Sequence, residues 1–424
     1  MADTIFALSS GRPPAAVSVI RISGANAHDA ARQIAGTLPG ARTAAVRELR
    51  KPSSGDLLDE ALVVRFDSPK SFTGEDIVEF QCHGGRAVVD SILRTLAEIA
   101  GLREAEPGEF TRRAFANGRI DLTEAEGLAD LIEAETESQR RAAILLAEGG
   151  LRKEIARWQE LLLSISARVE RAIDYDEEDD VLDPSIGRDC AALAANLKDW
   201  LSAPRVEPLK DGIRVVVAGP PNTGKSSLIN RIVGEERVIV TDLPGTTRDH
   251  VDVPLSLGGI PVRLTDTAGL RETEDRVEAI GVERAERLVE IADVLLWLGE
   301  PDGAPLHPHI LKLRGKADLG AGIPDSELLG VSALTGEGVA VLLQRIEAMA
   351  RSILPSEDSI ALNRRQAQLI GEAAEALWSV ASATDLVVIG ELVRRSRSAF
   401  DRLTGRAGVE DVLDALFGRF CLGK

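Results

Sequence analysis

The stretch Gly219-Pro-Pro-Asn-Thr-Gly-Lys-Ser226 carries residue types and a spacing that suit phosphate chemistry, because it matches G-x-x-x-x-G-K-[ST]. In such a loop, glycines allow successive backbone N–H groups to turn toward a β-phosphate, and the N-terminus of a following helix adds partial positive charge. Lys225 can then reach the β- and γ-phosphates, and the Ser226 hydroxyl can bind Mg²⁺. The nucleotide contacts predicted from this loop are Asn222, Thr223, Gly224, Lys225, Ser226 and Ser227.

Two further segments are typical of loops that sense a γ-phosphate. Asp266-Thr-Ala-Gly269 follows an apolar stretch, so Asp266 would hold a Mg²⁺-bound water and the Gly269 N–H would meet the γ-phosphate. Between the two loops lies Gly245-Thr-Thr-Arg-Asp249, in which Thr247 completes the Mg²⁺ shell only when a γ-phosphate is present. The three segments, in this order, predict a GTPase-type P-loop domain. The contacts predicted from them are Thr246, Thr247, Asp266, Thr267, Ala268 and Gly269.

The segment that would read the base departs from the usual Asn-Lys-x-Asp, because it reads Gly315-Lys-Ala-Asp318. Asp318 can still accept hydrogen bonds from the guanine N1–H and 2-amino group, which adenine does not offer in that arrangement. Gly315 cannot supply the asparagine side chain that braces the loop and contacts the base. We therefore predict GTP in preference to ATP, with weaker guanine affinity than the full motif gives. The predicted base contacts are Lys316, Asp318, Ser332, Ala333 and Leu334.

The residue after Gly269 is Leu270, where Ras-like proteins place a glutamine that orients the attacking water. Leucine cannot orient water, so hydrolysis requires another group. Acidic residues follow just downstream, and each on its own is more typical of a solvated helix face than of a catalyst. They are Glu272, Glu274, Asp275 and Glu278.

Three kinds of element must position these residues. Predicted strands at 213–218, 251–257, 261–266, 293–298 and 328–332 alternate with helices, which indicates a parallel, doubly wound α/β domain. Strands at 17–22, 61–66 and 77–82 with a helix at 87–100 indicate an α+β unit. Helices are predicted from about 121, with Thr123 as an N-cap, to about 172, and again at 188–203, 361–382, 385–401 and 408–418.

The composition favours a soluble, multidomain protein of 424 residues, of which 28% are charged and 44% hydrophobic. The net charge of −18 argues against broad nonspecific nucleic-acid binding, and an aromatic content of 3% argues against stacking platforms for single strands. Cys82, Cys190 and Cys421 are scattered without zinc-site spacing, which fits a reducing cytoplasm. Neither a secretory signal nor an apolar run of about 20 residues is visible, so we expect a cytoplasmic protein without a membrane span.

The chain resembles the MnmE (TrmE) family of tRNA-modification GTPases over almost its whole length. The terminal cysteine segment together with a mid-chain GTPase insertion is highly specific. The segments that carry the resemblance are Arg21-Ile-Ser-Gly24, Thr73-Gly-Glu-Asp76, His83-Gly-Gly85, Pro107-Gly-Glu-Phe-Thr111, Gly219-Pro-Pro-Asn-Thr-Gly-Lys-Ser226, Gly245-Thr-Thr-Arg-Asp249, Asp266-Thr-Ala-Gly-Leu-Arg-Glu272 and Cys421-Leu-Gly-Lys424.

The resemblance implies a multidomain fold with three domains. These are an N-terminal α+β folate-binding and dimerisation domain over 1–118, an all-α helical domain over 119–209 and 354–424, and an inserted Ras-like α/β P-loop G domain over 210–353. It also implies a homodimer that works with the flavoprotein MnmG to add an aminomethyl or carboxymethylaminomethyl group to C5 of the wobble uridine of certain tRNAs. The implied cofactors are K⁺, Mg²⁺ and a tetrahydrofolate derivative, 5-formyl- or methylene-tetrahydrofolate, as the one-carbon source.

Residue roles follow from the resemblance by position. Glu278 matches the family's catalytic glutamate, which orients the attacking water indirectly. Cys421 matches a cysteine that is important for the modification reaction. The implied ion ligands are Ser226 and Thr247 for Mg²⁺, and Asn222, Thr241, Leu243 and Thr246 for K⁺, with Thr241 also at the nucleotide. The implied folate contacts are Arg21, Glu79, Arg119 and Lys424, of which Arg119 stands where a lysine is often found.

Two alternatives remain open from the sequence. One is a ribosome-assembly GTPase of the Era or EngA type, against which the folate-like N-terminal region, the terminal cysteine segment and the absence of a basic KH-like segment argue. The other is a folate-dependent enzyme that carries a degenerate, non-hydrolysing nucleotide sensor, which the Gly315 departure favours.

Overall fold

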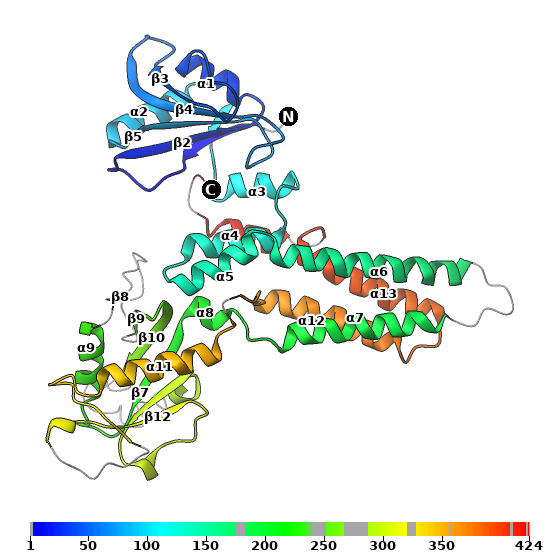
Figure 1. Cartoon of the computed structure of the whole chain (residues 1–424). Coiled ribbons are helices and arrows are strands. Elements are labelled where there is room, and N and C mark those ends of the chain that lie inside the picture. The colour runs from blue at the N-terminus through cyan, green and yellow to red at the C-terminus, as the bar shows by residue number, and fades with distance from the viewer. Residues whose placement is uncertain are drawn as a thin grey trace, which may run out of the picture. The chain divides into compact units, whose positions relative to one another are not determined.

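The computed structural model describes residues 3–174, 183–235, 237–238, 252–266, 287–319, 328–356, 358–407, 410–420 and 423. The chain divides into two compact units, which can be followed in Figure 1. The first unit comprises Met1–Ala129 and Asp401–Lys424, and the second comprises Asp130–Phe400. No helix in the described part of the chain is long and apolar enough to cross a membrane.

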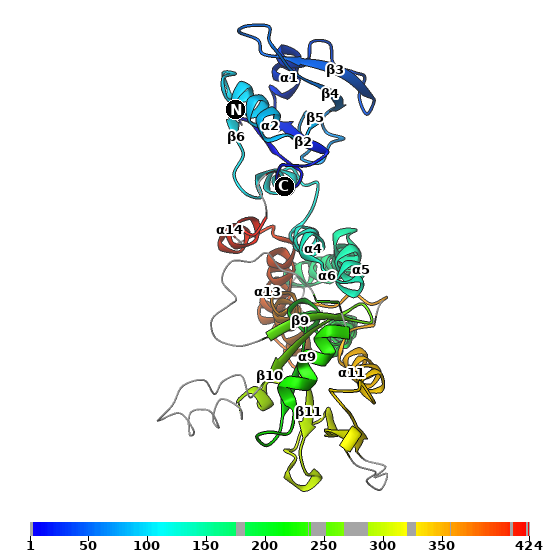
Figure 2. The ribbon, with the colours of Figure 1, turned by 90° about the vertical axis from the view of Figure 1, so that its left-hand side faces the viewer.

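The first unit is built on a six-stranded sheet in the order β3-β4-β5-β2-β1-β6, antiparallel except for the parallel pair β1 and β6. Helices α1 and α2 cover one face of this sheet (Figure 2) and share one apolar core with it. The strands are β1 (Thr4–Leu8), β2 (Val17–Ser23), β3 (Ala44–Arg50), β4 (Leu57–Phe66), β5 (Ile77–His83) and β6 (Leu102–Glu104). The helices are α1 (Ala27–Ala35), α2 (Arg86–Ala97), α3 (Glu109–Ala116) and α14 (Glu410–Phe417), with the start of α4 (Leu122–Glu133).

Strand β5 shows why this sheet has two different faces. Val78, Phe80 and Cys82 are buried under the helices, whereas Glu79 and Gln81 are only half-buried on the other face. The alternation of apolar and polar residues in the sequence dictates this arrangement, because successive strand side chains point to opposite faces.

Helix α4 corrects one prediction from the sequence, because Thr123 is not its N-cap. Asp121 precedes the first helical residue, and its Oδ1 accepts from the backbone N–H of Glu124 at 2.9 Å. The Glu124 side chain accepts in return from the Asp121 N–H at 2.8 Å. This is the reciprocal pair of a capping box, and the Thr123 hydroxyl only donates to the Asp121 carboxylate.

The C-terminal segment returns to the N-terminal sheet within the first unit. Gly423 is buried, and its carbonyl accepts a hydrogen bond from the Ser9 hydroxyl at 2.8 Å. A Cβ at Gly423 would lie 2.1 Å from the Leu8 carbonyl oxygen, and Gly423 has a φ of +90°, so a glycine is required here. Gly423 therefore lies beside strand β1.

The second unit contains a seven-stranded sheet in the order β13-β12-β11-β7-β10-β9-β8. The strands from β13 to β10 are parallel, and β9 and β8 continue the sheet antiparallel. Helices α9 and α11 pack on one face around a core that includes Val215, Leu264 and Leu296. The strands are β7 (Ile213–Ala218), β8 (Arg237–Val238), β9 (Asp252–Leu257), β10 (Ile260–Asp266), β11 (Val294–Leu298), β12 (Ile310–Arg314) and β13 (Leu329–Gly330). The helices around the sheet are α8 (Glu207–Asp211), α9 (Lys225–Glu235) and α11 (Val339–Ile353), with the short 3-10 turns η1 (Pro301–Gly303) and η2 (Ala317–Leu319).

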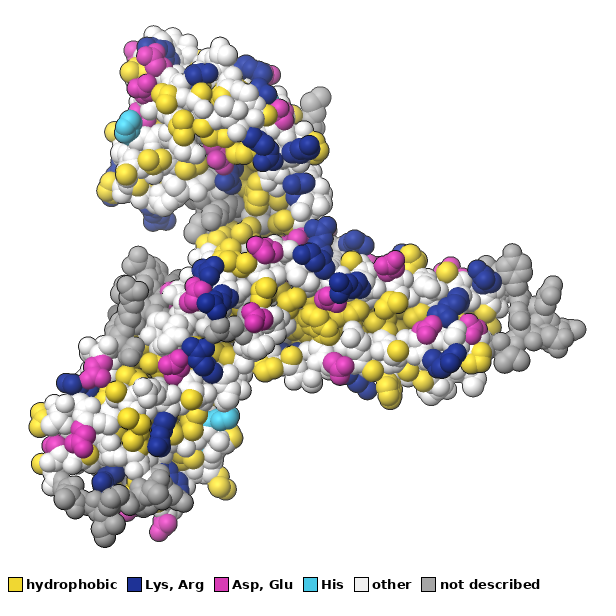
Figure 3. Space-filling view, viewed as in Figure 1, with side chains coloured by type: hydrophobic (Ala, Val, Ile, Leu, Met, Phe, Trp, Pro, Cys, Tyr) yellow, Lys and Arg dark blue, Asp and Glu magenta, His cyan; other side chains and the backbone are white. Residues whose placement is uncertain are grey.

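Long helices form the rest of the second unit. Figure 1 shows α6, α7, α12 and α13 running alongside one another, and Trp158 of α6 meets Trp200 of α7 edge to face at 5.4 Å between ring centroids. Figure 3 shows a band of hydrophobic side chains over these helices. The exposed large hydrophobic residues of α6 and α13 include Leu161, Leu163 and Val387. The helices are α5 (Glu137–Ala147), α6 (Gly150–Asp174), α7 (Pro184–Ser202), α12 (Arg364–Val380) and α13 (Leu386–Thr404).

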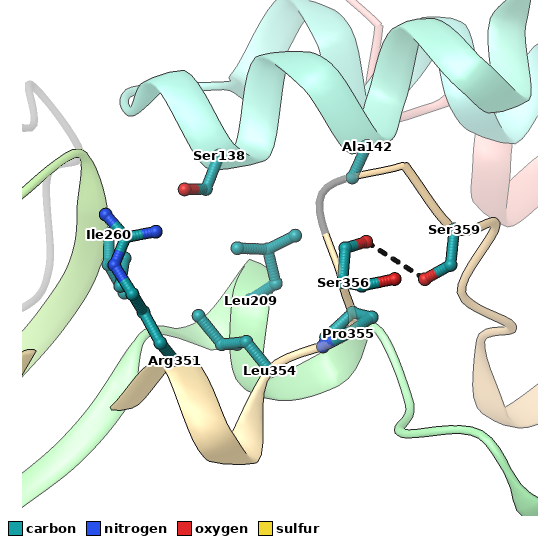
Figure 4. Close-up of a pocket in the computed structure, with 9 residues that line it drawn as sticks. All are labelled: Ser138, Ala142, Leu209, Ile260, Arg351, Leu354, Pro355, Ser356 and Ser359. Atoms are coloured by element: carbon teal, nitrogen blue, oxygen red, sulfur yellow. Dashed lines mark hydrogen bonds between the residues drawn. The ribbon is translucent and has the colours of Figure 1, made fainter. Parts of the chain in front are cut away.

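The turn between β9 and β10 meets helices α5 and α11. The Ser138 N–H donates to the Gly259 carbonyl at 3.1 Å, and the Arg351 guanidinium donates to the Gly258 carbonyl at 3.1 Å. A cavity of about 200 Å³ lies here, and Figure 4 shows Ser138, Leu209 and Arg351 around it. Its lining residues are Ser138, Ala142, Leu209, Ile260, Arg351, Leu354, Pro355, Ser356 and Ser359.

Candidate nucleotide-binding site

The glycine-rich loop joins the end of β7 to the start of α9, at the carboxyl edge of the parallel strands. Gly219 has a φ of +147°, and a Cβ at this position would lie 2.1 Å from the Leu298 carbonyl oxygen. Only glycine therefore allows the loop to leave β7 so close to β11. Asn222 and Gly224 also have positive φ values, of 63° and 97°, which turn the loop back toward the helix. The buried, β-branched run that precedes Gly219 holds this turn in place.

The side chain of Lys225 lies inside the loop and is only 7% exposed. Its ammonium donates to the carbonyls of Gly219 at 2.9 Å and Pro220 at 2.7 Å. The Thr223 hydroxyl also donates to the Pro220 carbonyl, at 3.0 Å. The ammonium group is thus held at the first turn of α9, where the helix N-terminus already favours anions.

Ser226 in the first turn of α9 lies directly against Asp266 at the end of β10. The Ser226 hydroxyl donates to the Asp266 carboxylate at 2.6 Å. Hydroxyl and carboxylate oxygens are ligands that suit Mg²⁺, so this pair fits the ion predicted from the sequence. The second ligand in that prediction, Thr247, lies outside the described residues.

The segment predicted to read the base is held to the end of β13. The Ser332 hydroxyl donates to the Asp318 carboxylate at 2.5 Å, and the Ala317 N–H donates to the Val331 carbonyl at 3.1 Å. Ser332 is fully buried, whereas the side chain of Leu334 is 80% exposed. Asp318 is therefore fixed by its neighbours before any base arrives.

The base segment also touches the glycine-rich loop. The Lys316 ammonium donates to the Asn222 carbonyl at 3.3 Å, and Lys316 has a left-handed φ of 57°. The structure thus brings the loop, Asp266 and the segment at 316–318 to the ends of β7, β10 and β12, which is where open parallel sheets bind ligands. Ser227 lies exposed on α9, and Ala333 lies half-buried after β13.

Several predicted site residues lie outside the part of the chain that the structure describes. They are Thr241, Leu243, Thr246, Thr247, Thr267, Ala268, Gly269, Glu278, Cys421 and Lys424.

The first unit brings together two of the predicted folate contacts. Arg21 of β2 and Glu79 of β5 are opposite each other in the sheet, and their side chains pair at 2.8 Å. The Arg21 guanidinium also lies over the rings of Phe72 and Phe110, at 5.7 and 5.5 Å from their centroids. Neither phenylalanine is among the candidate site residues predicted from the sequence, although Phe110 falls in the Pro107–Thr111 segment that carries the family resemblance.

Arg119 comes from the residues after α3 and is exposed. Gly74 has a φ of +81°, and a Cβ there would lie 3.2 Å from the Arg119 side chain. The Thr73–Asp76 turn therefore packs closely against this arginine. Gly423 is the last described residue and lies beside β1, which pairs with β2, the strand that carries Arg21. Lys424 directly follows Gly423 in the sequence.

The described cysteines do not offer reactive thiols. Burial raises the pKa of the Cys82 thiol to about 11, and it raises the pKa of the Cys190 thiol to about 11 as well. Both side chains are buried, so they act as small apolar groups rather than nucleophiles.

Among the described residues, one group of side chains has the types and proximity of metal ligands: His28, Asp67 and Asp76 of the first unit. The two ring nitrogens of His28 face different carboxylates, each at 3.5 Å. Arg65 already lies 2.9 Å from the Asp67 carboxylate and balances its charge. One imidazole cannot offer both nitrogens to one ion, so we assign no metal to this group.

A mainly parallel sheet that carries a G-x-x-x-x-G-K-S loop, a facing aspartate and an Asp318-containing base segment defines a P-loop GTPase domain, here within a larger α-helical and α+β chain. Two family models together match nearly the whole chain. The "GTP-binding protein TrmE N-terminus" model matches residues 4–119, and the "MnmE helical domain" model matches residues 122–421. The chain belongs to the MnmE (TrmE) family of tRNA modification GTPases, and the predicted family and fold class are confirmed.

Curated relatives match the whole chain. The tRNA modification GTPase MnmE of Erythrobacter litoralis is 50% identical, with 100% of each chain covered. That of Zymomonas mobilis is 48% identical over 99% of this chain and 100% of the relative, and that of Novosphingobium aromaticivorans is 48% identical over 100% of both. Among solved structures, the G domain of the T. maritima FeoB iron transporter is 21% identical and covers 32% of this chain and 98% of its own, with a TM-score of 0.25. That score is too low to support a structural comparison.

Proposed function

We propose that the chain hydrolyses GTP with Mg²⁺ and K⁺ and thereby drives modification of the wobble uridine of certain tRNAs. The proposed hydrolysis of GTP rests on one observation, the 2.6 Å contact between Ser226 and Asp266 beside the buried Lys225. These three groups are the hydroxyl, carboxylate and ammonium that phosphoryl transfer requires around one phosphate chain. GTP turnover by the purified chain, compared in K⁺ and Na⁺ buffers, tests this proposal.

GTP is the proposed nucleotide because of Asp318. Its carboxylate is oriented by Ser332 and can accept from the guanine N1–H and 2-amino group. We propose weaker guanine binding than a full Asn-Lys-x-Asp motif gives, because Gly315 has no side chain to contact the base. Calorimetric titration with GDP and ADP checks the preference, and equal affinities would contradict it.

We propose that hydrolysis uses Glu278, because Leu270 cannot orient water. Asn222, Thr241, Leu243 and Thr246 would hold K⁺, and Ser226 and Thr247 would hold Mg²⁺. A bound K⁺ would neutralise charge that develops between the β- and γ-phosphates. Glu278→Ala is expected to retain GTP binding and lose nearly all turnover in K⁺ buffer. Unchanged turnover would remove Glu278 from the mechanism, and absent turnover in the wild-type chain would favour a folate enzyme with a nucleotide sensor.

We propose a folate site in the first unit at Arg21, Glu79, Arg119 and Lys424. The support is an ion pair with two aromatic rings packed around its guanidinium, next to the strand that holds Gly423. A tetrahydrofolate derivative carries both an aromatic ring system and carboxylates, which these groups can stack on and pair with. Titration of Arg21→Ala and wild type with 5-formyl-tetrahydrofolate tests the site, and equal affinities would contradict it.

The proposed modification partner is the flavoprotein MnmG, which would act with a homodimer of this chain on tRNA in the cytoplasm. Exposed apolar side chains on α6 and α13 support a protein partner, since such surfaces are usually covered. Nucleoside analysis of tRNA from cells that lack the chain tests the reaction. Cys421→Ser is expected to keep GTPase activity and lose modification, whereas full modification would end the proposed role of that thiol.

The proposed domain organisation has boundaries at 1–118, 119–209 with 354–424, and 210–353. Limited proteolysis followed by mass spectrometry tests it, since exposed linkers between domains are cleaved first. Cleavage inside the strands of either sheet before cleavage near 118, 209 or 354 would contradict these boundaries.

A further inference from the structure

We propose that Gly315 sets the position of the phosphate-binding loop, so that the absence of a side chain there is a requirement of nucleotide binding in this chain as well as the loss of a base contact. This inference rests on the proposed binding of GTP at the loop. It gives Gly315 a positioning role between the phosphate end and the base end of the site.

The first observation is a close approach between two backbones. Gly315 directly follows β12, and a Cβ built on it would lie 2.8 Å from the carbonyl oxygen of Thr223 in the glycine-rich loop. Carbon and oxygen atoms that are not bonded normally stay more than about 3 Å apart, and a backbone carbonyl cannot rotate away as a side chain can. Gly315 does not have a positive φ, so space rather than backbone conformation demands the glycine.

The second observation is that the next residue tightens the same contact. The Lys316 ammonium donates to the Asn222 carbonyl at 3.3 Å. The carbonyls of Asn222 and Thr223 therefore contact Lys316 and Gly315, two successive residues of the base segment. Both Asn222 and Lys316 have left-handed φ values, of 63° and 57°. These conformations are sparsely populated for side-chain-bearing residues and persist only where their surroundings fix them. The backbones of the two segments therefore fit together as one surface.

An asparagine at position 315 could not be accommodated without moving this surface. Its Cβ would push the Thr223 carbonyl outward and carry Asn222 and the following Gly224-Lys225 N–H groups with it. These groups are the ones that would face the phosphates. Asp318 is held separately by Ser332, so the base contact would remain in place while the phosphate contacts moved.

A positioning role for Gly315 predicts the opposite outcome to the simple loss of a base contact. If Gly315 were only a missing base contact, Gly315→Asn would strengthen GDP binding by restoring the common motif. We expect instead that Gly315→Ala and Gly315→Asn each weaken binding of GDP by about tenfold or more, as overpacking against a fixed backbone does. Binding of IDP, which lacks the 2-amino group, is expected to weaken by the same factor, so the GDP to IDP affinity ratio stays at the wild-type value.

The test is calorimetric titration of the full-length variants with GDP and with IDP, in the same K⁺ and Mg²⁺ buffer. Gly330→Ala is the matched control, because a Cβ there would meet the nearest atom, Ala317 Cβ, at an ordinary 3.5 Å. Asp318→Asn is the second control and should change the GDP to IDP ratio, because it alters the group that faces the base. Far-UV circular dichroism and urea denaturation without nucleotide show whether each variant is folded. If Gly315→Asn does not fold, the GDP and IDP affinities of Gly315→Ala, which adds a single methyl group, provide the test.

Equal weakening of GDP and IDP in a folded Gly315 variant, with Gly330→Ala unchanged, supports the inference. Wild-type affinity in Gly315→Ala, tighter GDP binding by Gly315→Asn, or a changed GDP to IDP ratio in either variant would overturn it. A folded wild-type chain that binds neither nucleotide would instead refute the proposed function, and this inference with it.

Discussion

Replacing Ser332 by alanine is expected to weaken guanine binding and, to a greater extent, to destabilise the second unit. The Ser332 side chain is fully buried after β13. Its hydroxyl donates to the Asp318 carboxylate at 2.5 Å and accepts from the Thr335 N–H at 3.1 Å. The substitution removes both hydrogen bonds at once and leaves the surrounding apolar packing almost intact.

The two effects have different sizes because they arise from different atoms. Losing a hydrogen bond to a charged group costs about 1.5–3 kcal/mol, and leaving the Thr335 N–H unpaired adds to this unless water reaches it. We therefore expect a loss of about 2–3 kcal/mol in the free energy of unfolding. For GDP binding, the cost is that of re-ordering a released Asp318 side chain, about 0.5–1.5 kcal/mol, which corresponds to about two- to tenfold weaker affinity.

Urea denaturation measures the first effect and calorimetric titration with GDP measures the second. Ser352→Ala is the matched control, because that hydroxyl is exposed on α11 and donates only to a carbonyl of its own helix, Met349, at 2.7 Å. It should leave both quantities unchanged. A Ser332→Ala variant with wild-type stability, or with wild-type GDP affinity, would refute the reasoning that this hydroxyl orients Asp318.

Asp318→Asn should reverse the base preference from guanine toward xanthine, because an amide donates where the carboxylate accepts; competition between GDP and XDP for the protein measures this, and an unchanged preference would place the base elsewhere. Gly219→Ala should abolish measurable GDP binding in calorimetry, since its Cβ would collide with the Leu298 carbonyl; binding within a factor of two of wild type would contradict that close approach. Burial raises the pKa of Glu109, but the hydrogen bonds that it accepts, foremost from Arg103, outweigh burial and hold the pKa below its usual value, so this carboxylate stabilises the fold above about pH 4.3 and the effect fades as pH falls through the lowered pKa. Glu109→Gln should therefore lose about 1–2 kcal/mol at pH 7 and differ less from wild type below pH 4 in urea denaturation, and a difference that does not depend on pH would count against the ion pair.

The sequence predicted the second unit's central strand and its loop because the local signals there are strong. β7 has the predicted bounds, Ile213–Ala218, since a run of β-branched residues ends at a glycine that nothing else can replace. Strand β12 was not predicted. Ile310–Arg314 is short, and the polar Lys312 interrupts its apolar residues. It forms a strand because β11 and β13 pair with it on either side.

The candidate-site residues that could be predicted from the sequence are those that belong to a recognisable local motif. The sequence indicated Ser226 and Asp266 as partners through one ion, and the structure brings their side chains into contact. It gave no sign that Phe72 and Phe110 would surround Arg21, because the three residues come from separate segments that only the folded sheet brings together. The role of Thr123 was mistaken for a related reason, since the adjacent Asp121 offers a stronger acceptor for the same helix end.

Strand β10 connects the turn that contacts helix α5 with the candidate nucleotide-binding site. It begins at Ile260, next to the Gly259 carbonyl that the first turn of α5 holds, and it ends at Asp266 beside Ser226. The strand is hydrogen-bonded on both sides, to β7 and to β9, so its length of about 20 Å is fixed. A displacement of Asp266 along the strand axis would therefore also displace Gly259 and strain the hydrogen bond that the Ser138 N–H donates to it.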